Sequence, residues 1–189
     1  VPKENIVVVG GIHFKGGIQG NCHLQHLTLR HATWHGVRGH SFFTMEDVLV
    51  EQCGGCGVVA YDTGGVGRCT DVEVRHCGKS GVIAAMGGSI TLIGAKTTVH
   101  HTCTKGESDS YGLGVYSSSS STIQLISPLT KKKVAIDNVG GGNWGQKYGG
   151  HISQIKTIVP LNRPRSKQEE KAYHYRGYNN DNAPIMCYI

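Results

Sequence analysis

Three stretches of the chain repeat one phrase: Leu27-Thr-Leu-Arg-His-Ala32, Val48-Leu-Val-Glu-Gln-Cys53 and Val72-Glu-Val-Arg-His-Cys77. After three more residues each phrase is followed by glycine and valine, at Gly36-Val37, Gly57-Val58 and Gly81-Val82. The three glycines are separated by 21 and then 24 residues. A repeat period in the twenties predicts a solenoid in which successive repeats stack on one another.

The pattern within each repeat predicts three short strands. Apolar residues alternate in the repeated phrase, which is the periodicity of a strand with one buried face. The Gly-Val segments predict a second strand after a bend, where glycine supplies backbone angles that other residues adopt at a cost. Residues 42–45, 66–69 and 89–93 predict a third strand. Three strands in each repeat are typical of a parallel β-helix.

Further units extend the pattern at both ends. Residues 6–18 predict irregular first rungs, and residues 97–101 with 114–116 predict a fourth unit interrupted by a loop at 105–110. We read Ile123–Pro128, leading to Val134–Ile136, as a fifth unit, and residues 152–159 as one more strand. No helix is expected before about residue 165. The sequence therefore predicts an all-β parallel β-helix of about five to six rungs.

The predicted stacking aligns equivalent residues in columns about 4.8 Å apart per rung. One outward column carries alternating charges, a second is polar, and a third, inward column holds small residues. These columns are Arg30, Glu51, Arg75 and His100; His31, Gln52, His76 and His101; and Ala32, Cys53, Cys77 and Thr102. Opposite charges on neighbouring strands attract, so the first column supports the predicted register.

The repeated V-x-V-x-x-C-x-x-x-G-V phrase resembles the right-handed parallel β-helix proteins of the pectate-lyase-like superfamily. The resemblance covers about residues 6–140 and implies fold but not activity, because this architecture carries lyases, hydrolases, epimerases and scaffolds. The phrases at 43–53 and 88–101 are also similar to uncharacterised β-helix repeat proteins of unicellular algae. That similarity implies no activity.

The sequence divides into three parts. We expect the β-helix over residues 1–140, a glycine-rich exit with one more strand over 141–159, and a polar tail over 160–189. The tail contains Tyr173, Tyr175, Tyr178 and Tyr188, which is unlike an aromatic-poor disordered terminus. Two roles remain open for it: it caps the solenoid of its own chain, or it lies across a neighbouring subunit.

Composition narrows the classes of partner. The chain has 189 residues and a net charge of +6, which favours an anionic partner such as an acidic glycan. No sequence signature of nucleic-acid binding is present, and apolar runs such as Ile6–Val9 are too short to span a bilayer. Seven cysteines are an odd number, and Cys53 and Cys77 share one column. This pattern favours buried thiols in a reducing intracellular compartment over a disulfide framework.

Two groups of residues have the chemistry of metal ligands. Cys53 and Cys56 form a C-x-x-C pair, a pattern found in redox couples and zinc sites, but Cys53 belongs to the small column and no second pair completes four ligands. Asp47 and Asp71 lie one rung apart, where two carboxylates could share a calcium ion. We expect no metal and no other cofactor, and interpret the cysteines as core residues.

The outward columns contain the remaining candidates for a binding surface. The candidates are Arg30, Glu51, Arg75, His31, His76, His100 and His101, together with Tyr173, Tyr175 and Tyr178 in the tail. Histidines in such a strip bind a metal, sense pH or simply form polar surface. Arg30, Arg75 and His76 are the catalytic candidates if the chain is a lyase or epimerase acting on an acidic polysaccharide. The sequence favours a non-catalytic structural or binding module in a larger assembly, with a carbohydrate-active enzyme or a glycan-binding module as alternatives.

Overall fold

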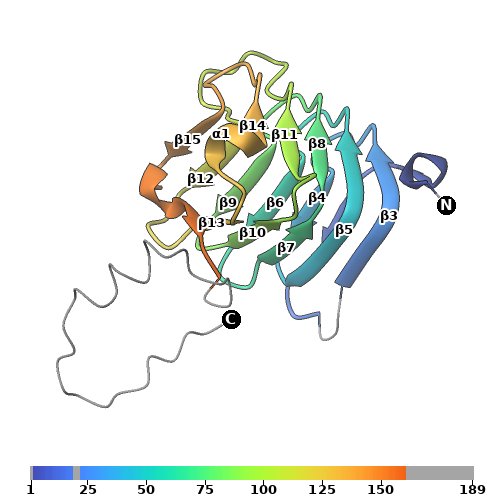
Figure 1. Ribbon diagram of the computed structural model, residues 1–189, viewed down its shortest axis with the longest axis horizontal. Coiled ribbons are helices and arrows are strands. Elements are labelled where there is room, and N and C mark those ends of the chain that lie inside the picture. The colour runs from blue at the N-terminus through green and yellow to red at the C-terminus, as the bar shows by residue number, and fades with distance from the viewer. Residues whose placement is uncertain (1, 19–21, 161–189) are drawn as a thin grey trace, which may run out of the picture. The chain divides into compact units, whose positions relative to one another are not determined.

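The computed structural model describes residues 2–18 and 22–160, and these residues form a parallel β-solenoid (Figure 1). Every pair of neighbouring strands is parallel, and each strand bonds to its equivalents in adjacent turns. The predicted all-β fold class and stacked repeats are therefore confirmed. The candidate tyrosines Tyr173, Tyr175 and Tyr178 lie outside the described residues.

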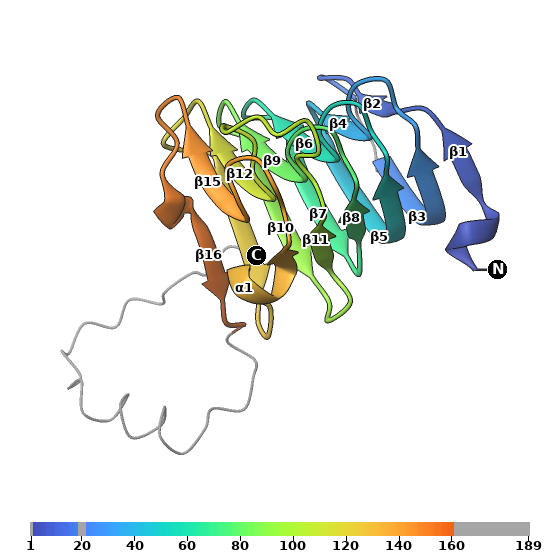
Figure 2. The same ribbon diagram turned by 90° about the horizontal axis from the view of Figure 1, so that it is seen from above.

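Sheet B forms one side of the solenoid and contributes one strand to each rung. Its six strands follow each other along the axis in sequence order (Figure 2). They are β2 (Ile12–Phe14), β4 (Val37–Gly39), β6 (Val58–Tyr61), β9 (Val82–Ala85), β12 (Leu113–Tyr116) and β15 (Trp144–Lys147). Six stacked strands correspond to about six rungs, as the repeat predicts.

Sheet A contains ten strands and forms the other two sides. They are β1 (Val7–Val9), β3 (Cys22–Arg30), β5 (Phe42–Glu51), β7 (Val66–Thr70), β8 (Glu73–Arg75), β10 (Ser89–Ile93), β11 (Thr98–His100), β13 (Thr122–Ile126), β14 (Ala135–Ile136) and β16 (Ile155–Ile158). The long strands β3 and β5 bend at His26 and Asp47, which both adopt left-handed backbone angles. Face 1 comprises their first halves with β7, β10, β13 and β16, and face 2 comprises β1, their second halves, β8, β11 and β14.

The predicted register is confirmed on face 2. Arg30 is paired with Glu51, Glu51 with Arg75, and Arg75 with His100. Val50 pairs with Val74 beneath this column, and both side chains are fully buried. The small column of Ala32, Cys53, Cys77 and Thr102 is also buried. Like residues therefore stack on like residues, with aliphatic side chains inside and charged ones outside.

The repeat glycines serve a different purpose from the predicted one. None of Gly36, Gly57 and Gly81 has a left-handed φ. A Cβ on Gly57 would instead press against the Cγ1 atom of Val74 and lie 2.7 Å from the carbonyl oxygen of Gly81. These glycines are required because successive rungs pack too closely there for any side chain.

The left-handed corner angles are adopted by the polar column. His31, Gln52, His76 and His101 have φ values between 50° and 56°. Their side chains are exposed, so the bend between face 2 and sheet B is made by a residue that faces solvent. A left-handed angle disfavours most side chains, so the rungs tolerate a local cost at this corner.

Two sequence-based expectations about the later rungs are wrong. One turn of helix, α1 (Lys131–Val134), forms well before residue 165 and buries Val134; four residues are too few to show helical periodicity in the sequence. Strand β13 stacks on β10 in face 1, not on β11, and the face 2 column continues at β14. Strands of faces 1 and 2 carry the same alternation, so the sequence pattern does not distinguish them.

The remaining elements close the two ends. Short 3₁₀ turns lie at Lys3–Asn5 and Ile152–Gln154. Strands β15 and β16 continue the solenoid past residue 140, the predicted end of the β-helix, to Ile158. Residues 101–112 form irregular turns, which include the predicted loop at 105–110. No helix within residues 2–18 and 22–160 is long and apolar enough to cross a membrane.

Candidate functional site

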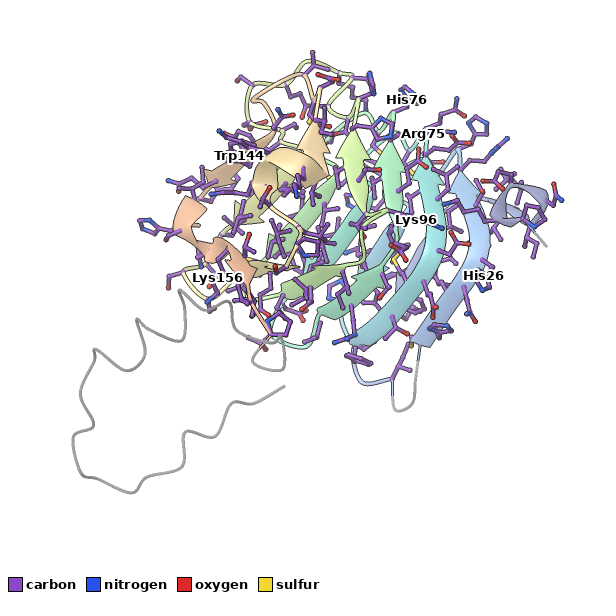
Figure 3. All side chains as sticks on the ribbon, in the orientation of Figure 1. His26, Arg75, His76, Lys96, Trp144 and Lys156 are labelled. Carbon is purple, nitrogen blue, oxygen red and sulfur yellow. The ribbon has the colours of Figure 1, made fainter. Side chains whose placement is uncertain are left out.

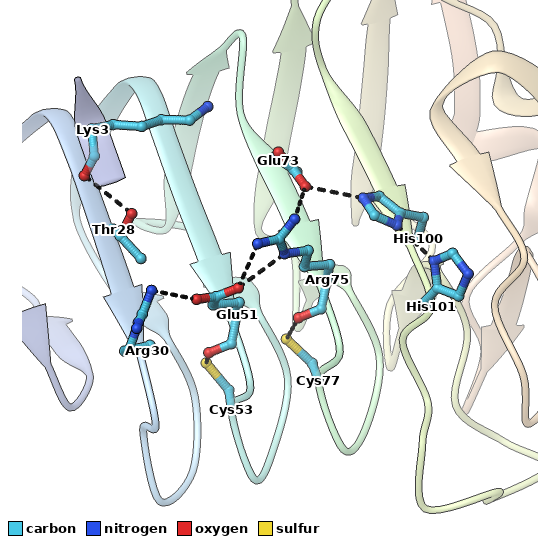
Figure 4. Close-up of polar contacts among 10 residues, drawn as sticks. All are labelled: Lys3, Thr28, Arg30, Glu51, Cys53, Glu73, Arg75, Cys77, His100 and His101. Carbon is cyan, nitrogen blue, oxygen red and sulfur yellow. Dashed lines mark hydrogen bonds and ion pairs between the residues drawn. The ribbon is translucent and has the colours of Figure 1, made fainter. Parts of the chain in front are cut away.

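Face 2 carries a continuous series of ion pairs across the rungs, here called the ion ladder: Arg30, Glu51, Glu73, Arg75, His100 and His101 (Figure 4). At its centre lies Glu51, whose side chain is only 7% exposed. Arg30 Nη2 lies 2.8 Å from Glu51 Oε1, and Arg75 donates through Nε and Nη2 to Glu51 Oε2, both at 2.9 Å. The alternating column predicted from the sequence thus forms direct contacts.

The ladder continues from Arg75 to the histidines. Arg75 Nη1 donates to Glu73 Oε1 at 3.0 Å, and His100 Nε2 lies 3.2 Å from the same oxygen. His100 Nδ1 and His101 Nδ1 are 2.7 Å apart, so one of these nitrogens donates to the other. The ring of His76 lies 5.5 Å from that of His101, and Figure 3 shows His76 next to Arg75.

The ladder satisfies its own charges. Two arginines face two glutamates, so the side chains of Arg30, Glu51, Glu73 and Arg75 sum to zero net charge. Burial works against the charge of Arg75, but its hydrogen bonds to Glu51 and Glu73 and their negative charges raise its pKa. The structure therefore brings together the predicted Arg30, Glu51, Arg75, His76, His100 and His101, in an arrangement that stabilises the stacking of the rungs.

The carboxylates of Asp47 and Asp71 are used separately. Asp47 accepts from His26 Nδ1 at 3.0 Å and pairs with Lys3 at 3.2 Å, and the hydrogen bond from His26 lowers its pKa. Asp71 Oδ1 accepts from the backbone N–H of Lys96 at 3.0 Å. Both residues sit at the corner between faces 1 and 2 with left-handed angles. Each carboxylate therefore has a structural partner at its corner.

The two cysteines of the C-x-x-C pair point into different environments. Cys53 belongs to the main core, whereas Cys56 lies in a small outer cluster with Val59, Ile83 and Ala85. Burial raises the pKa of Cys56 to about 12. A protonated thiol is a poor nucleophile and metal ligand. Across residues 2–18 and 22–160, no group of three or more His, Cys, Asp or Glu side chains is arranged to hold a metal ion.

A second site, which the sequence reasoning missed, lies where the first two rungs pass from face 2 to sheet B. It is a groove of about 650 Å³, here called the Trp34 pocket, lined by Gly10, Gly11, Ile12, His13, Ala32, Thr33, Trp34, His35 and Arg38. The indole of Trp34 is 71% exposed. The carbonyl oxygen of Trp34 accepts from Gly55 N at 2.5 Å, which fixes its backbone to the next rung.

The polar groups of the Trp34 pocket are basic. Arg38 lies with its guanidinium 4.8 Å from the ring centre of Tyr61, and its Nε is buried without a hydrogen-bond partner. His35 Nδ1 accepts from the backbone N–H of Cys56 at 3.1 Å, so the neutral ring carries its proton on Nε2. Burial, followed by the positive charges of Arg38, Lys79 and His13, lowers the pKa of His35.

The basic surface continues across the first rungs of sheet B. His40 lies between His13 and Tyr61, with its ring centre 5.1 Å from each. His40 Nδ1 is 2.7 Å from Asp62 Oδ2, which satisfies this imidazole. Burial, followed by the positive charges of His40, Arg38 and Lys15, lowers the pKa of His13. Among residues 2–18 and 22–160, no carboxylate lines the pocket itself.

One signal in the sequence marks this pocket. Trp34 occupies the corner position that holds Gly55 and Lys79 in the next two repeats, so a large aromatic residue replaces a small or charged one. The alternation of apolar residues does not reveal the difference, because corner residues lie between the strands. No protein family, no curated protein and no solved structure gave a significant match to this chain.

Proposed function

We propose that the protein is a non-catalytic β-solenoid, a rigid structural or binding module that works as part of a larger assembly. One observation carries this proposal: the two arginines of the ladder share Glu51, and their contacts extend from rung to rung. Charged groups with partners on neighbouring strands stabilise the register of a sheet. The outward face therefore has a role in holding the solenoid together.

The same contacts argue against the main alternative, a lyase or epimerase that uses Arg30 or Arg75 as its base. A base must lose a proton before it can accept one from the substrate. The hydrogen bonds from Arg75 to Glu51 and Glu73 raise its pKa, which makes this loss harder. The close grouping of Arg75 and His76 on one face is the feature that keeps a carbohydrate-active enzyme as the alternative.

We also infer that the chain is a member of the right-handed β-helix proteins of the pectate-lyase-like superfamily. The support is the parallel pairing of all strands and the triangular path over two halves of sheet A and one sheet B. Members of one architecture carry unrelated activities, so this inference adds nothing about chemistry.

The proposed role in a larger assembly includes association through the tail, residues 160–189. Parallel solenoids expose unpaired strand edges at both ends, which are covered by caps or partners. Deleting residues 160–189 is expected to reduce the mass of the assembly in multi-angle light scattering. An unchanged mass would contradict a role of the tail in association.

An assay on uronate polymers separates the module from the enzyme. The full chain is incubated with polygalacturonate and alginate, with and without calcium; unsaturated products of a lyase are followed by absorbance, and epimerisation of alginate is followed by proton NMR. We expect no product above a protein-free control. Product that appears with the wild type and with Arg68→Ala, but not with Arg75→Ala, would overturn the proposal, because Arg68 is exposed on face 1 and serves as the matched control.

A further inference from the structure

We propose that the Trp34 pocket is a ligand site for the charged ring of an anionic saccharide, with Trp34 as the stacking surface and Arg38 as the anion-binding group. This inference rests on the proposed function as a binding module. It moves the binding site from the outward columns of face 2 to the edge of sheet B on the first two rungs.

Trp34 presents an exposed aromatic ring at the pocket. An indole that is 71% exposed leaves a large apolar ring in water, and such surfaces mark binding sites more often than isolated small apolar residues do. The backbone of Trp34 is held by Gly55, so the ring is presented from a fixed point of the solenoid. A flat, exposed ring offers a platform for the C–H face of a sugar.

Arg38 supplies the anion-binding group of the pocket. Its side chain forms no ion pair and no hydrogen bond with any residue of 2–18 or 22–160, and its Nε is buried without a partner. Arg30 also has a buried Nε without a partner, but Glu51 binds its Nη2. A guanidinium binds carboxylate and sulfate through two parallel hydrogen bonds, so Arg38 has unused capacity for an anion.

Two histidines add hydrogen-bond donors to the pocket. His13 and His35 line the same pocket, and the positive charges of Arg38, Lys15, Lys79 and His40 act on them. Lys79 is paired with Glu107 and His40 with Asp62, whereas Arg38 and Lys15 form no ion pair with a residue of 2–18 or 22–160. Repulsion among these groups is relieved when an anion enters. The neutral His35 also presents Nε2–H as a donor, because its Nδ1 accepts from the backbone. The pocket thus combines donors with a surplus of positive charge.

The size and openness of the groove favour a sugar as the ring. Its volume of about 650 Å³ lies in the range of roughly 300–1,000 Å³ that is usual for small-molecule sites. Trp34 is the only aromatic ring besides the histidines among the lining residues, so a planar base would be stacked on one side only. A Cβ on Gly10 would meet no atom within 4 Å, which leaves room there for a ring that is not flat, whereas Gly11 lies against the carbonyl oxygen of His35.

Binding of defined oligosaccharides tests the proposal. The probes are a heparin hexasaccharide for sulfate, a trigalacturonate for carboxylate, a neutral maltohexaose and AMP, each titrated by calorimetry into the full chain. We expect binding of at least one anionic sugar, weakened at least tenfold by Trp34→Ala and by Arg38→Gln. The matched controls Tyr148→Ala and Arg68→Gln, which alter an aromatic ring 73% exposed and an exposed arginine elsewhere, are expected to stay within twofold.

Fluorescence supplies a second readout. The chain has two tryptophans, so Trp144→Phe leaves Trp34 as the single indole, and its emission is expected to change on titration with the anionic sugar. Thermal unfolding of each variant shows whether a lost affinity reflects a lost fold.

The outcomes separate this inference from the proposed function. Anionic sugar binding that survives Trp34→Ala and Arg38→Gln would overturn the pocket assignment and leave the binding module intact. Absence of binding to both anionic sugars, equal binding of maltohexaose, or tighter binding of AMP would overturn the ligand class. The module itself fails only in the product assay, through turnover that depends on Arg75.

Discussion

The ion ladder of face 2 and the Trp34 pocket are built from similar side chains, yet they differ in what those side chains contact. In the ladder, Arg30 and Arg75 share one buried carboxylate. In the pocket, Arg38 forms no ion pair with a carboxylate of residues 2–18 and 22–160, and its guanidinium lies over the ring of Tyr61. Basic residues with internal partners stabilise the fold, whereas basic residues without them are available to a ligand. The number of arginines alone does not separate the two roles.

The largest loss of stability is expected from a substitution in the packing between rungs, which supports both regions. Gly57→Ala places a methyl group against Val74 and the carbonyl of Gly81, so we expect unfolding free energy to fall by about 3 kcal/mol, as in overpacked cores. Urea unfolding followed by circular dichroism measures the change. The control is Gly16→Ala, whose Cβ would lie 3.8 Å from its nearest neighbour. Equal midpoints for both variants would contradict the close stacking of rungs.

Removal of the central charge of the ion ladder is expected to have the second-largest effect on stability. Glu51→Gln leaves two arginines facing a neutral amide, and we expect a loss of about 2 kcal/mol of unfolding free energy. Glu46→Gln, on the same strand but exposed and without a side-chain hydrogen bond or ion pair to a described residue, is the control. We expect Glu51→Gln to leave oligosaccharide affinity within twofold. A variant that binds more weakly but unfolds normally would return the binding site to face 2.

Acid is expected to change fold stability and sugar affinity in opposite directions through the histidines of the pocket. The pKa values of His13 and His35 are lowered in the folded chain, so the unfolded chain binds protons more readily and stability falls as pH decreases from about 7 to about 5. A bound anion favours the protonated rings, so sugar affinity rises over the same range. Calorimetry at several pH values checks this, and His35→Gln should flatten both slopes. An affinity that falls on acidification would contradict the assignment.

The smallest effect on stability is expected at Arg38. Arg38→Gln removes no ion pair within residues 2–18 and 22–160, so we expect its unfolding free energy to change by less than about 0.5 kcal/mol. Arg75→Gln, which removes contacts to Glu51 and Glu73, is the comparison and should destabilise the chain measurably. Thermal unfolding of the two variants sharpens the contrast. Equal losses would show that Arg38 is as structural as Arg75.

The acidic aspartates add a further loss at low pH. Hydrogen bonds from His26 and His40 lower the pKa values of Asp47 and Asp62, so the stability they contribute is present above the unfolded pKa of about 4 and is lost below it. Asp47 lies at the corner between faces 1 and 2, whereas Asp62 pairs with His40, whose ring centre lies 5.1 Å from that of the pocket residue His13.

The glycines show where sequence reasoning identified the right residue for the wrong reason. The spacing of Gly36, Gly57 and Gly81 correctly locates the bend, and glycine at a bend suggests unusual backbone angles. The structure assigns those angles to His31, Gln52, His76 and His101, and assigns the glycines to close contact with the next rung. A sequence read one repeat at a time carries no information about the distance between rungs.

By itself, the sequence determined the solenoid, the register of face 2 and the charged column, because stacking places each residue beside its equivalent one repeat away. The tertiary structure decided which basic groups are already paired, where β13 stacks, and that Trp34, His35 and Arg38 form a pocket with Gly10, Gly11 and His13. Those contacts join residues at different positions of neighbouring rungs. Their partners depend on how each corner turns in space, which alternation along one strand does not encode.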